Sequence, residues 1–242
     1  MQKVNLKLNG RDWQVYLRDE ADQSVYNEIF KLGEYRSADS AIKTAKHAIV
    51  DAGAHAGFFT MYCRSLNKQV KIYAVEPEPG NLKSLKQHLA ENKILGVKVI
   101  AGALAGQSEA RRLILSTDSH NHQLAAPVFR GEADQDADKT ILVKAFSFAD
   151  FRHKNKIKKI SLLKIDIEGG EYELFESLSA EDLSMVNFVI LEYHYGSRYK
   201  YIAEKLKVNG FGVQIFPSHF DKTMGYIWAK NKRSLKLRQA SK

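Results

Sequence analysis

Cysteine and long apolar runs are nearly absent from this sequence. Cys63 is the only cysteine among 242 residues, which excludes an internal disulfide and a zinc centre built from cysteines, and suits a reducing compartment. No run approaches the length of about 18 apolar residues that a membrane span needs, and the first residues lack the apolar segment of a signal peptide. We therefore expect a cytoplasmic protein without a membrane partner.

Acidic residues are fewer than basic ones. The chain has 37 Lys and Arg residues against 28 Asp and Glu residues, a formal net charge of +9, and the excess is concentrated at residues 152–159 and in the C-terminal tail. A basic surface can attract nucleic acid or an anionic substrate, but charge runs in linkers and tails are more often solvated surface. We therefore do not expect nucleic acid as a partner.

The central part of the chain alternates short apolar runs with amphipathic stretches, a pattern typical of buried parallel strands joined by crossover helices. The five runs lie at residues 47–51, 71–76, 97–103, 161–167 and 187–194. Two further runs with alternating apolar residues, 211–215 and 224–230, predict an antiparallel pair that closes one edge. The sequence therefore predicts an α/β domain over residues 47–231, followed by a basic tail over residues 232–242.

An extension precedes this domain, over residues 1–46. It begins with two alternating apolar runs on either side of Asn9 and Gly10, a dipeptide typical of β-hairpins. Apolar residues at helical spacing follow, before Gly33 as a C-terminal cap. We expect a small N-terminal hairpin with a helical segment, and the exposed edges of hairpin and sheet offer surfaces for a homodimer.

Residues 104–160 are the least regular part of the domain. Two strand-like runs, residues 111–115 and 140–146, flank a polar loop that contains His120 and His122. Because no adjacent acid or third histidine completes a ligand set, we predict no metal at this loop. We expect the loop to cover the cofactor or the acceptor instead.

A glycine-containing turn follows the first apolar run. In VDAGAHAG (residues 50–57), Asp51 precedes Gly53 and Gly57, and the next residues can begin a helix. Gly53 permits a tight turn and Gly57 lets the helix pack near the strand, while free amides at the helix start can hold a carboxylate. The G-x-G-x-x-G pattern of a dinucleotide site is absent. The turn therefore predicts a nucleotide-type cofactor without a pyrophosphate.

A second acid, Glu76, ends the next apolar run. A carboxylate in this place can accept hydrogen bonds from both ribose hydroxyls of an adenosine. Glu76 alone would suit NAD equally well, so at this point the kind of adenosine cofactor stays open.

Charged residues mark the end of the fourth run, in KIDIEGGE (residues 164–171). With side chains alternating, Lys164, Asp166 and Glu168 share one side of a strand that ends at residue 166 or 167. Lys164 and Asp166 could form a buried ion pair, but buried charges are rarely retained for stability, which favours a functional site. We predict Asp166 as an active-site carboxylate, and Glu168 as a residue that orients the cofactor's amino group or the acceptor.

The fifth run ends in Glu192 and His194. His194 has the intrinsic pKa to take a proton from a hydroxyl and is our candidate general base, the alternative being a hydrogen-bonded structural histidine. Asp166 and Glu192 would offer oxygen ligands to Mg²⁺, but we predict no metal centre.

Four segments together resemble the FkbM-type methyltransferases. They are VYNEIFKLGEY (25–35), IVDAGAHAGFFT (49–60), YAVEPEPGNLKSLKQHLAEN (73–92) and LLKIDIEGGEYELFE (162–176). The resemblance implies a Rossmann-like class I methyltransferase fold, with a seven-stranded, mostly parallel sheet and an antiparallel last strand. It also implies S-adenosylmethionine as the cofactor and O-methylation of a hydroxyl on a sugar or small secondary metabolite.

The resemblance also implies roles for individual residues. Asp51, Gly53 and Gly57 match the family's loop against the methionine part of the cofactor. Glu76 matches the ribose acid, and Ala103 would lie near the adenine. The full set expected at the cofactor is Asp51, Gly53, Ala54, His55, Gly57, Glu76, Pro77, Ala103 and Asp166. No acceptor-binding residue is carried over, because family members differ in the segments that cover the acceptor.

Two other functions stay open. An RNA or protein methyltransferase would use the basic surface, but base-nitrogen methyltransferases resemble one another in an Asn/Asp-Pro-Pro-aromatic segment where this chain reads IDIEGGE. A cofactor-binding module without catalysis, or an NAD-linked dehydrogenase, would use the same architecture. We expect a saccharide or another small molecule as the acceptor.

Overall fold

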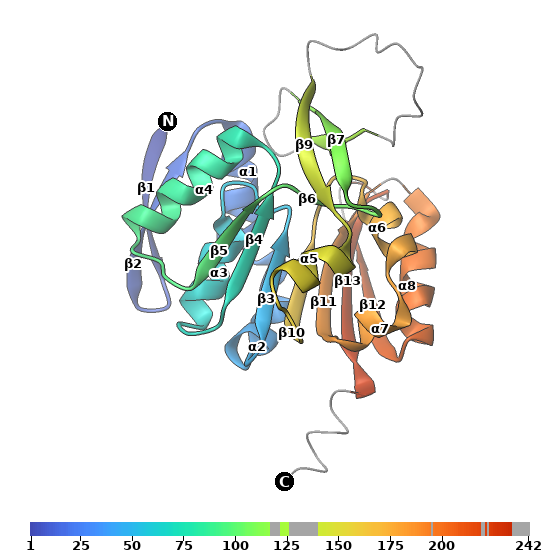
Figure 1. Ribbon diagram of the computed structural model, residues 1–242. Helices are drawn as coiled ribbons and strands as arrows, with labels where there is room; N and C mark the ends of the chain where they lie inside the picture. Colours follow the sequence, from blue (N-terminus) through green and yellow to red (C-terminus); the bar gives the residue numbers. More distant parts are fainter. Residues whose placement is uncertain (117–121, 126–139, 195, 219–220, 222, 234–242) are drawn as a thin grey trace.

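A seven-stranded sheet forms the centre of the protein in the computed structural model, which describes residues 1–116, 122–125, 140–194, 196–218, 221 and 223–233. The strand order is β12-β13-β11-β10-β3-β4-β5 (Figure 1). The strands are β3 (Ala48–Ala52), β4 (Ile72–Glu76), β5 (Val97–Ala101), β10 (Ile160–Ile165), β11 (Val186–Tyr193), β12 (Phe211–Pro217) and β13 (Gly225–Asn231). The first five are mutually parallel, and β13 runs antiparallel between β11 and β12. The predicted sheet, mostly parallel with an antiparallel last strand, is confirmed.

Helices cover both faces of this sheet. One face carries α1 (Glu20–Tyr26), η1 (Asn27–Leu32), η2 (Glu34–Ala38), α2 (Asp39–Lys43), α3 (Phe58–Leu66) and α4 (Pro79–Glu91), and the other carries α5 (Phe148–Lys154), α6 (Glu171–Ser177), α7 (Ala180–Ser184) and α8 (Tyr199–Val208). Neighbouring residues of β3 show the division, because Ile49 is buried with Phe58 of α3 while Val50 is buried with Phe175 of α6. Strand side chains that alternate between two apolar layers explain the continuous apolar runs in the sequence.

The N-terminal extension packs on the face that carries α3 and α4. It contains the predicted hairpin, β1 (Gln2–Leu8) and β2 (Arg11–Leu17), and Trp13 of β2 is buried in the same cluster as Phe58. The expected helical segment is present but irregular, because α1 widens into the π-helix η1 over Asn27–Leu32. Gly33 ends it in the left-handed conformation, with φ of 70°, as the C-terminal cap predicts.

A second sheet stands above the main one in Figure 1, with the order β6-β9-β7-β8. Its strands are β6 (Ala103–Leu104), β7 (Glu109–Ile114), β8 (Gln123–Leu124) and β9 (Thr140–Phe146). The strand-like runs at 111–115 and 140–146 therefore pair with each other. The predicted strand over residues 97–103 is wrong at its end, because the chain turns at Gly102 and Ala103 joins β9. A side chain at Gly102 would lie 2.6 Å from the Lys144 carbonyl oxygen, so the turn requires glycine.

Two other features of the sequence can be placed in this fold. Among the described residues, no helix is long and apolar enough to cross a membrane. Cys63 lies in α3 and is fully buried, and burial raises the pKa of its thiol. His120 and the tail from residue 234 onward fall outside the described residues.

Candidate functional site

An inner cavity lies at the carboxyl ends of β3, β4, β10 and β11. Most of the residues predicted at the cofactor or in catalysis line it, namely Gly53, Ala54, His55, Glu76, Pro77, Ala103, Asp166, Glu168 and His194. His122 of the polar loop lines it as well. The ligand edge of a doubly wound sheet is therefore where these side chains meet.

The turn after β3 is held between two neighbouring strands. The amides of Gly53 and Ala54 both donate to the Val75 carbonyl at 3.0 Å. Gly53 has a φ of +75°, and a Cβ on it would lie 1.6 Å from the carbonyl oxygen of Asp166. Only glycine fits this close approach of two strand ends.

Two predicted cofactor residues do not line the cavity. Asp51 is fully buried and accepts a hydrogen bond of 2.6 Å from Thr60 of α3. Its carboxylate therefore connects the end of β3 to α3. Gly57 serves helix packing, but its neighbour is α4 rather than the strand, since a Cβ there would lie 2.3 Å from Leu85 Cδ1. Thr60 was not predicted, because only the fold brings it to the aspartate.

Glu76, at the end of β4, is held in one orientation by three donors. Its Oε2 accepts from the His55 amide at 2.8 Å, and its Oε1 accepts from the Glu78 amide at 2.9 Å and from Asn81 Nδ2 at 3.3 Å. Burial raises the pKa of Glu76 to about 7, although these hydrogen bonds favour the charged form. Carboxylate oxygens accept up to four hydrogen bonds in total, so capacity remains for a ribose hydroxyl.

The ion pair that the sequence offered as one alternative at the end of β10 is present. Lys164 Nζ lies 3.1 Å from Asp166 and 3.6 Å from Asp51, and it also donates to the Gly53 carbonyl at 2.7 Å. Asp166 nevertheless faces the cavity. The strand ends at Ile165, one or two residues earlier than predicted. Glu168 has a φ of +53°, so the expected strand alternation does not extend to it, although its side chain still lines the cavity.

His194 lies among carboxylates. Its Nδ1 is 3.3 Å from Glu171 and its Nε2 is 3.6 Å from Glu168. Burial opposes its charged form, but the hydrogen bond and charge of Glu171, together with Glu168, raise its pKa to about 10. Glu171, which the sequence analysis missed, is fully buried and also accepts from the amides of residues 167 and 169. An imidazole that keeps its proton at neutral pH is a poor general base.

Glu192 has a different environment from these paired groups. Its carboxylate forms no hydrogen bond or ion pair with the described residues, and burial followed by the charge of Asp166 raises its pKa well above the usual range. One ligand atom each of Asp166, Glu192 and His194 lie within 4.8 Å of one another, a spacing that could hold a metal ion. The ion pair of Asp166 with Lys164 and the proton on His194 both oppose a cation there.

A groove of about 620 Å³ adjoins the inner cavity. The two share Glu28, Glu192 and Met224 as lining residues. The outer wall is aromatic and acidic, with Phe216, Tyr226 and Trp228 beside Glu34. Tyr226 donates its hydroxyl to Glu34 at 2.6 Å. The volume lies within the range typical of small-molecule sites, about 300–1,000 Å³.

Known proteins with this pattern identify the family. The model of the "Methyltransferase FkbM domain" matches residues 51–222, roughly seven-tenths of the chain. This chain belongs to the FkbM methyltransferase family. It is therefore an S-adenosylmethionine-dependent methyltransferase of the FkbM type, and the resemblance noted in its sequence is confirmed.

Individual relatives agree with this assignment. Methyltransferase sdnD of Sordaria araneosa is 28% identical over 194 residues, which are 70% of this chain and 74% of that protein. Methyltransferase 1 of Beauveria bassiana is 24% identical over 164 residues, 60% of this chain and 63% of that protein.

Two solved structures share the fold of this FkbM methyltransferase. Methyltransferase FkbM from Methylobacillus flagellatus KT is 12% identical with a TM-score of 0.50, over 88% of this chain and 55% of that chain. An rRNA methylase from Streptococcus thermophilus is 11% identical with a TM-score of 0.50, over 82% of this chain and 96% of that chain. At these identities the similarity establishes the class I methyltransferase fold alone.

Proposed function

We propose that this FkbM methyltransferase transfers a methyl group to a hydroxyl of a small molecule that binds in the groove. The observation that carries the proposal is the wall shared by the two cavities, where Glu28, Glu192 and Met224 line both. A donor in the inner cavity and an acceptor in the groove would meet at this wall. Alignment of the two reactants in a fixed geometry supplies most of the rate in such a displacement.

The residues of the inner cavity fit S-adenosylmethionine. When bound, this cofactor supplies an electrophilic methyl group on a positively charged sulfur. Glu76 would accept a hydrogen bond from one ribose hydroxyl, Ala103 and Pro77 would border the adenine, and the turn at Gly53 would lie against the methionine part. Asp166 would face the cofactor in its ionised form, because Lys164 and His194 outweigh burial and lower its pKa.

Glu192 is the group best placed to take the acceptor's proton. It would accept the hydroxyl proton while the acceptor oxygen bonds to the methyl carbon and the carbon–sulfur bond breaks, leaving the electron pair on sulfur. The positive charge of the donor favours the ionised form of a nearby carboxylate, so donor binding would prepare Glu192 as a base. Glu168 and His194 would then orient the reactants rather than move the proton.

The character of the groove favours a small hydroxyl compound, such as a sugar or secondary metabolite, over RNA. Three carboxylates line it, on Glu28, Glu34 and Glu192, and the described residues that line it include no Lys or Arg. Phosphate groups would find no cationic partner among these residues, whereas hydroxyls can form hydrogen bonds with the carboxyl groups and sugar rings can pack on the aromatic side chains.

Two experiments test this function. Calorimetry with S-adenosylhomocysteine and with NAD should show binding of the first only, and no binding of S-adenosylhomocysteine at millimolar concentration would overturn the proposal. A screen of sugar and polyketide hydroxyls with methyl-labelled S-adenosylmethionine should label an oxygen. Label on RNA instead, together with an RNA affinity that weakens steeply with salt, would establish the alternative function.

A further inference from the structure

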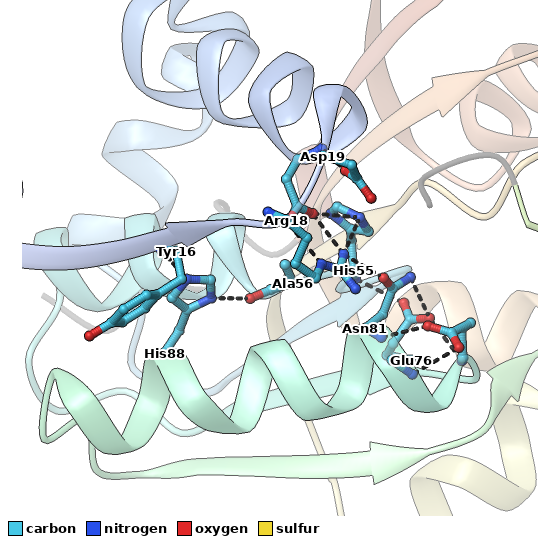
Figure 2. A network of polar contacts seen from close by, with 11 residues as sticks. Tyr16, Arg18, Asp19, His55, Ala56, Glu76, Asn81 and His88 are labelled. Atoms are coloured by element: carbon cyan, nitrogen blue, oxygen red, sulfur yellow. Dashed lines mark hydrogen bonds and ion pairs between the residues drawn. The ribbon is translucent and has the colours of Figure 1, made fainter. Parts of the chain in front are cut away.

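Arg18 joins the N-terminal extension to the cofactor turn. It lies between β2 and α1, and Figure 2 shows its side chain reaching toward His55 and Asn81. Its Nη2 donates to Asn81 Oδ1 at 2.8 Å and lies 3.2 Å from His55 Nε2. Its Nε and Nη2 donate to the carboxylate of Asp22 at 2.8 Å and 2.7 Å. A single guanidinium therefore contacts three other residues.

Two of those residues, His55 and Asn81, are among the three that donate hydrogen bonds to Glu76. Asn81 Nδ2 contacts Glu76 Oε1 at 3.3 Å, and the His55 amide donates to Glu76 Oε2 at 2.8 Å. Asn81 can present its Nδ2 group to Glu76 because its Oδ1 accepts from the arginine, which fixes the orientation of the amide. Asn81 is only 3% exposed, so water cannot readily replace Arg18 in that role.

A second contact fixes the same turn to β2. The Tyr16 amide donates to His88 Nε2 at 2.8 Å, and His88 Nδ1 lies 2.8 Å from the Ala56 carbonyl (Figure 2). Burial lowers the pKa of His88, so the ring is neutral, with Nε2 accepting and Nδ1 donating its proton to Ala56. The turn at residues 55 and 56 is thus connected to the hairpin twice, through Arg18 at His55 and through Tyr16 and His88 at Ala56.

Pairing with Asp22 explains only part of this geometry. Asp22 is fully buried and needs a cation, which Lys would also supply as a point charge. The bond to Asn81 uses the planar fork of Arg18 in addition. Arg18 also lies outside residues 51–222, the segment that the family model matches.

We propose that Arg18 is a positioning residue for the cofactor's ribose, acting through Asn81 and His55 on the carboxylate of Glu76. The inference rests on the proposed function only in that Glu76 binds the ribose of S-adenosylmethionine. Through this chain of contacts, Arg18 acts on the donor site without lining the inner cavity.

The test compares S-adenosylhomocysteine with its 2′-deoxy analogue by calorimetry. The wild type should prefer the first by about tenfold to a hundredfold, the effect of one hydrogen bond to a charged group. Arg18→Lys keeps a cation beside Asp22 but loses the fork, so it should melt near the wild-type temperature while its preference falls below about threefold. Arg36→Lys, an exposed arginine of the same extension, is the control and should keep the preference.

A second variant separates positioning from folding. Asn81→Ala leaves the contact of Arg18 with Asp22 in place and should lose the same preference, and Arg18→Lys in that background should cause no further loss. Full preference in either single variant would overturn the inference. A wild type that binds both analogues equally would overturn it too, while leaving the proposed function standing, whereas a wild type that binds neither would overturn both.

Discussion

Lys164 and Asp166 form an ion pair of 3.1 Å at the carboxyl end of β10, with the lysine side chain only 4% exposed. The same Nζ donates to the carbonyl of Gly53, so one ammonium group joins the central strand to the cofactor turn. Burial opposes its charge, but Asp166 and Asp51 raise the pKa of Lys164 to about 12. Lys164 therefore stays charged beside the two carboxylates.

Removal of this ammonium should unfold the protein more easily. Lys164→Met leaves Asp51 and Asp166 without a cation, which typically costs about 3–5 kcal/mol for a buried pair. Urea denaturation at pH 7.5 measures the loss. Lys159→Met, at an exposed position, should change the free energy of unfolding by less than about 0.5 kcal/mol, and equal effects in the two variants would contradict the structure.

Donor affinity should depend on pH through Glu76. A ribose hydroxyl would donate to the ionised carboxylate of Glu76, whose pKa is raised to about 7 in the free protein, so the affinity should be fully present above pH 8. It should weaken as the pH falls through 7, by up to about tenfold per pH unit at lower pH. Calorimetry with S-adenosylhomocysteine between pH 6 and 8.5 checks this. Glu76→Gln should bind weakly at every pH, and a pH dependence that survives in it would refute the assignment.

His194 should remain an imidazolium at physiological pH. Its pKa of about 10 predicts a protonated ring in NMR spectra from pH 6 to 8.5. His194→Gln should bind the donor with little change, since neither ring nitrogen is needed as an acceptor. A ring that titrates near pH 6.5 would return His194 to the role of general base.

Glu192→Gln should separate binding from turnover. The amide keeps the shape of the wall between the cavities but takes no proton, so methyl transfer should fall by about 10²–10⁴-fold. The affinity for S-adenosylhomocysteine should change by less than about threefold. Glu34→Gln, farther out in the groove, is the matched control for a lost charge and should affect the acceptor's KM rather than kcat. Turnover that survives in Glu192→Gln would exclude this residue as the base.

Gly53→Ala should be far more damaging than Gly10→Ala. Both glycines have positive φ, which costs an alanine about 1–2 kcal/mol. A side chain at Gly10 meets open space, whereas one at Gly53 would lie 1.6 Å from the Asp166 carbonyl oxygen. Thermal melting should show the second variant losing at least about 3 kcal/mol more. Similar losses would mean that the two strand ends do not approach as described.

The main sheet could be predicted because each of its buried strands leaves a pattern in its own short stretch of sequence. Residues 160–165 are all buried, and a strand enclosed on both faces leaves a continuous apolar run. Boundaries were less accurate where a neighbour decides them. The turn at Gly102 depends on Lys144 and Phe146 of β9, which no pattern in residues 97–103 encodes.

The residues of the candidate site could be predicted where a motif coincides with the end of a strand. Glu76, Asp166 and His194 were expected at the ligand edge and all line the inner cavity. Glu28 was not expected there, and the contacts of Arg18 with His55 and Asn81 were not expected either, because both depend on how the extension docks on the domain. The protonation state of His194 could not be predicted from the sequence either, since it depends on two carboxylates that come together only in the folded chain.

The burial of Cys63 makes this protein convenient for thiol chemistry. A thiol that is fully enclosed, with its pKa raised by burial, does not react with maleimides while the fold is closed. Ser37 lies exposed at the groove, so a cysteine introduced there could carry a single fluorophore that reports entry of the acceptor. In the same sample, the slow labelling rate of Cys63 would report how often the core opens.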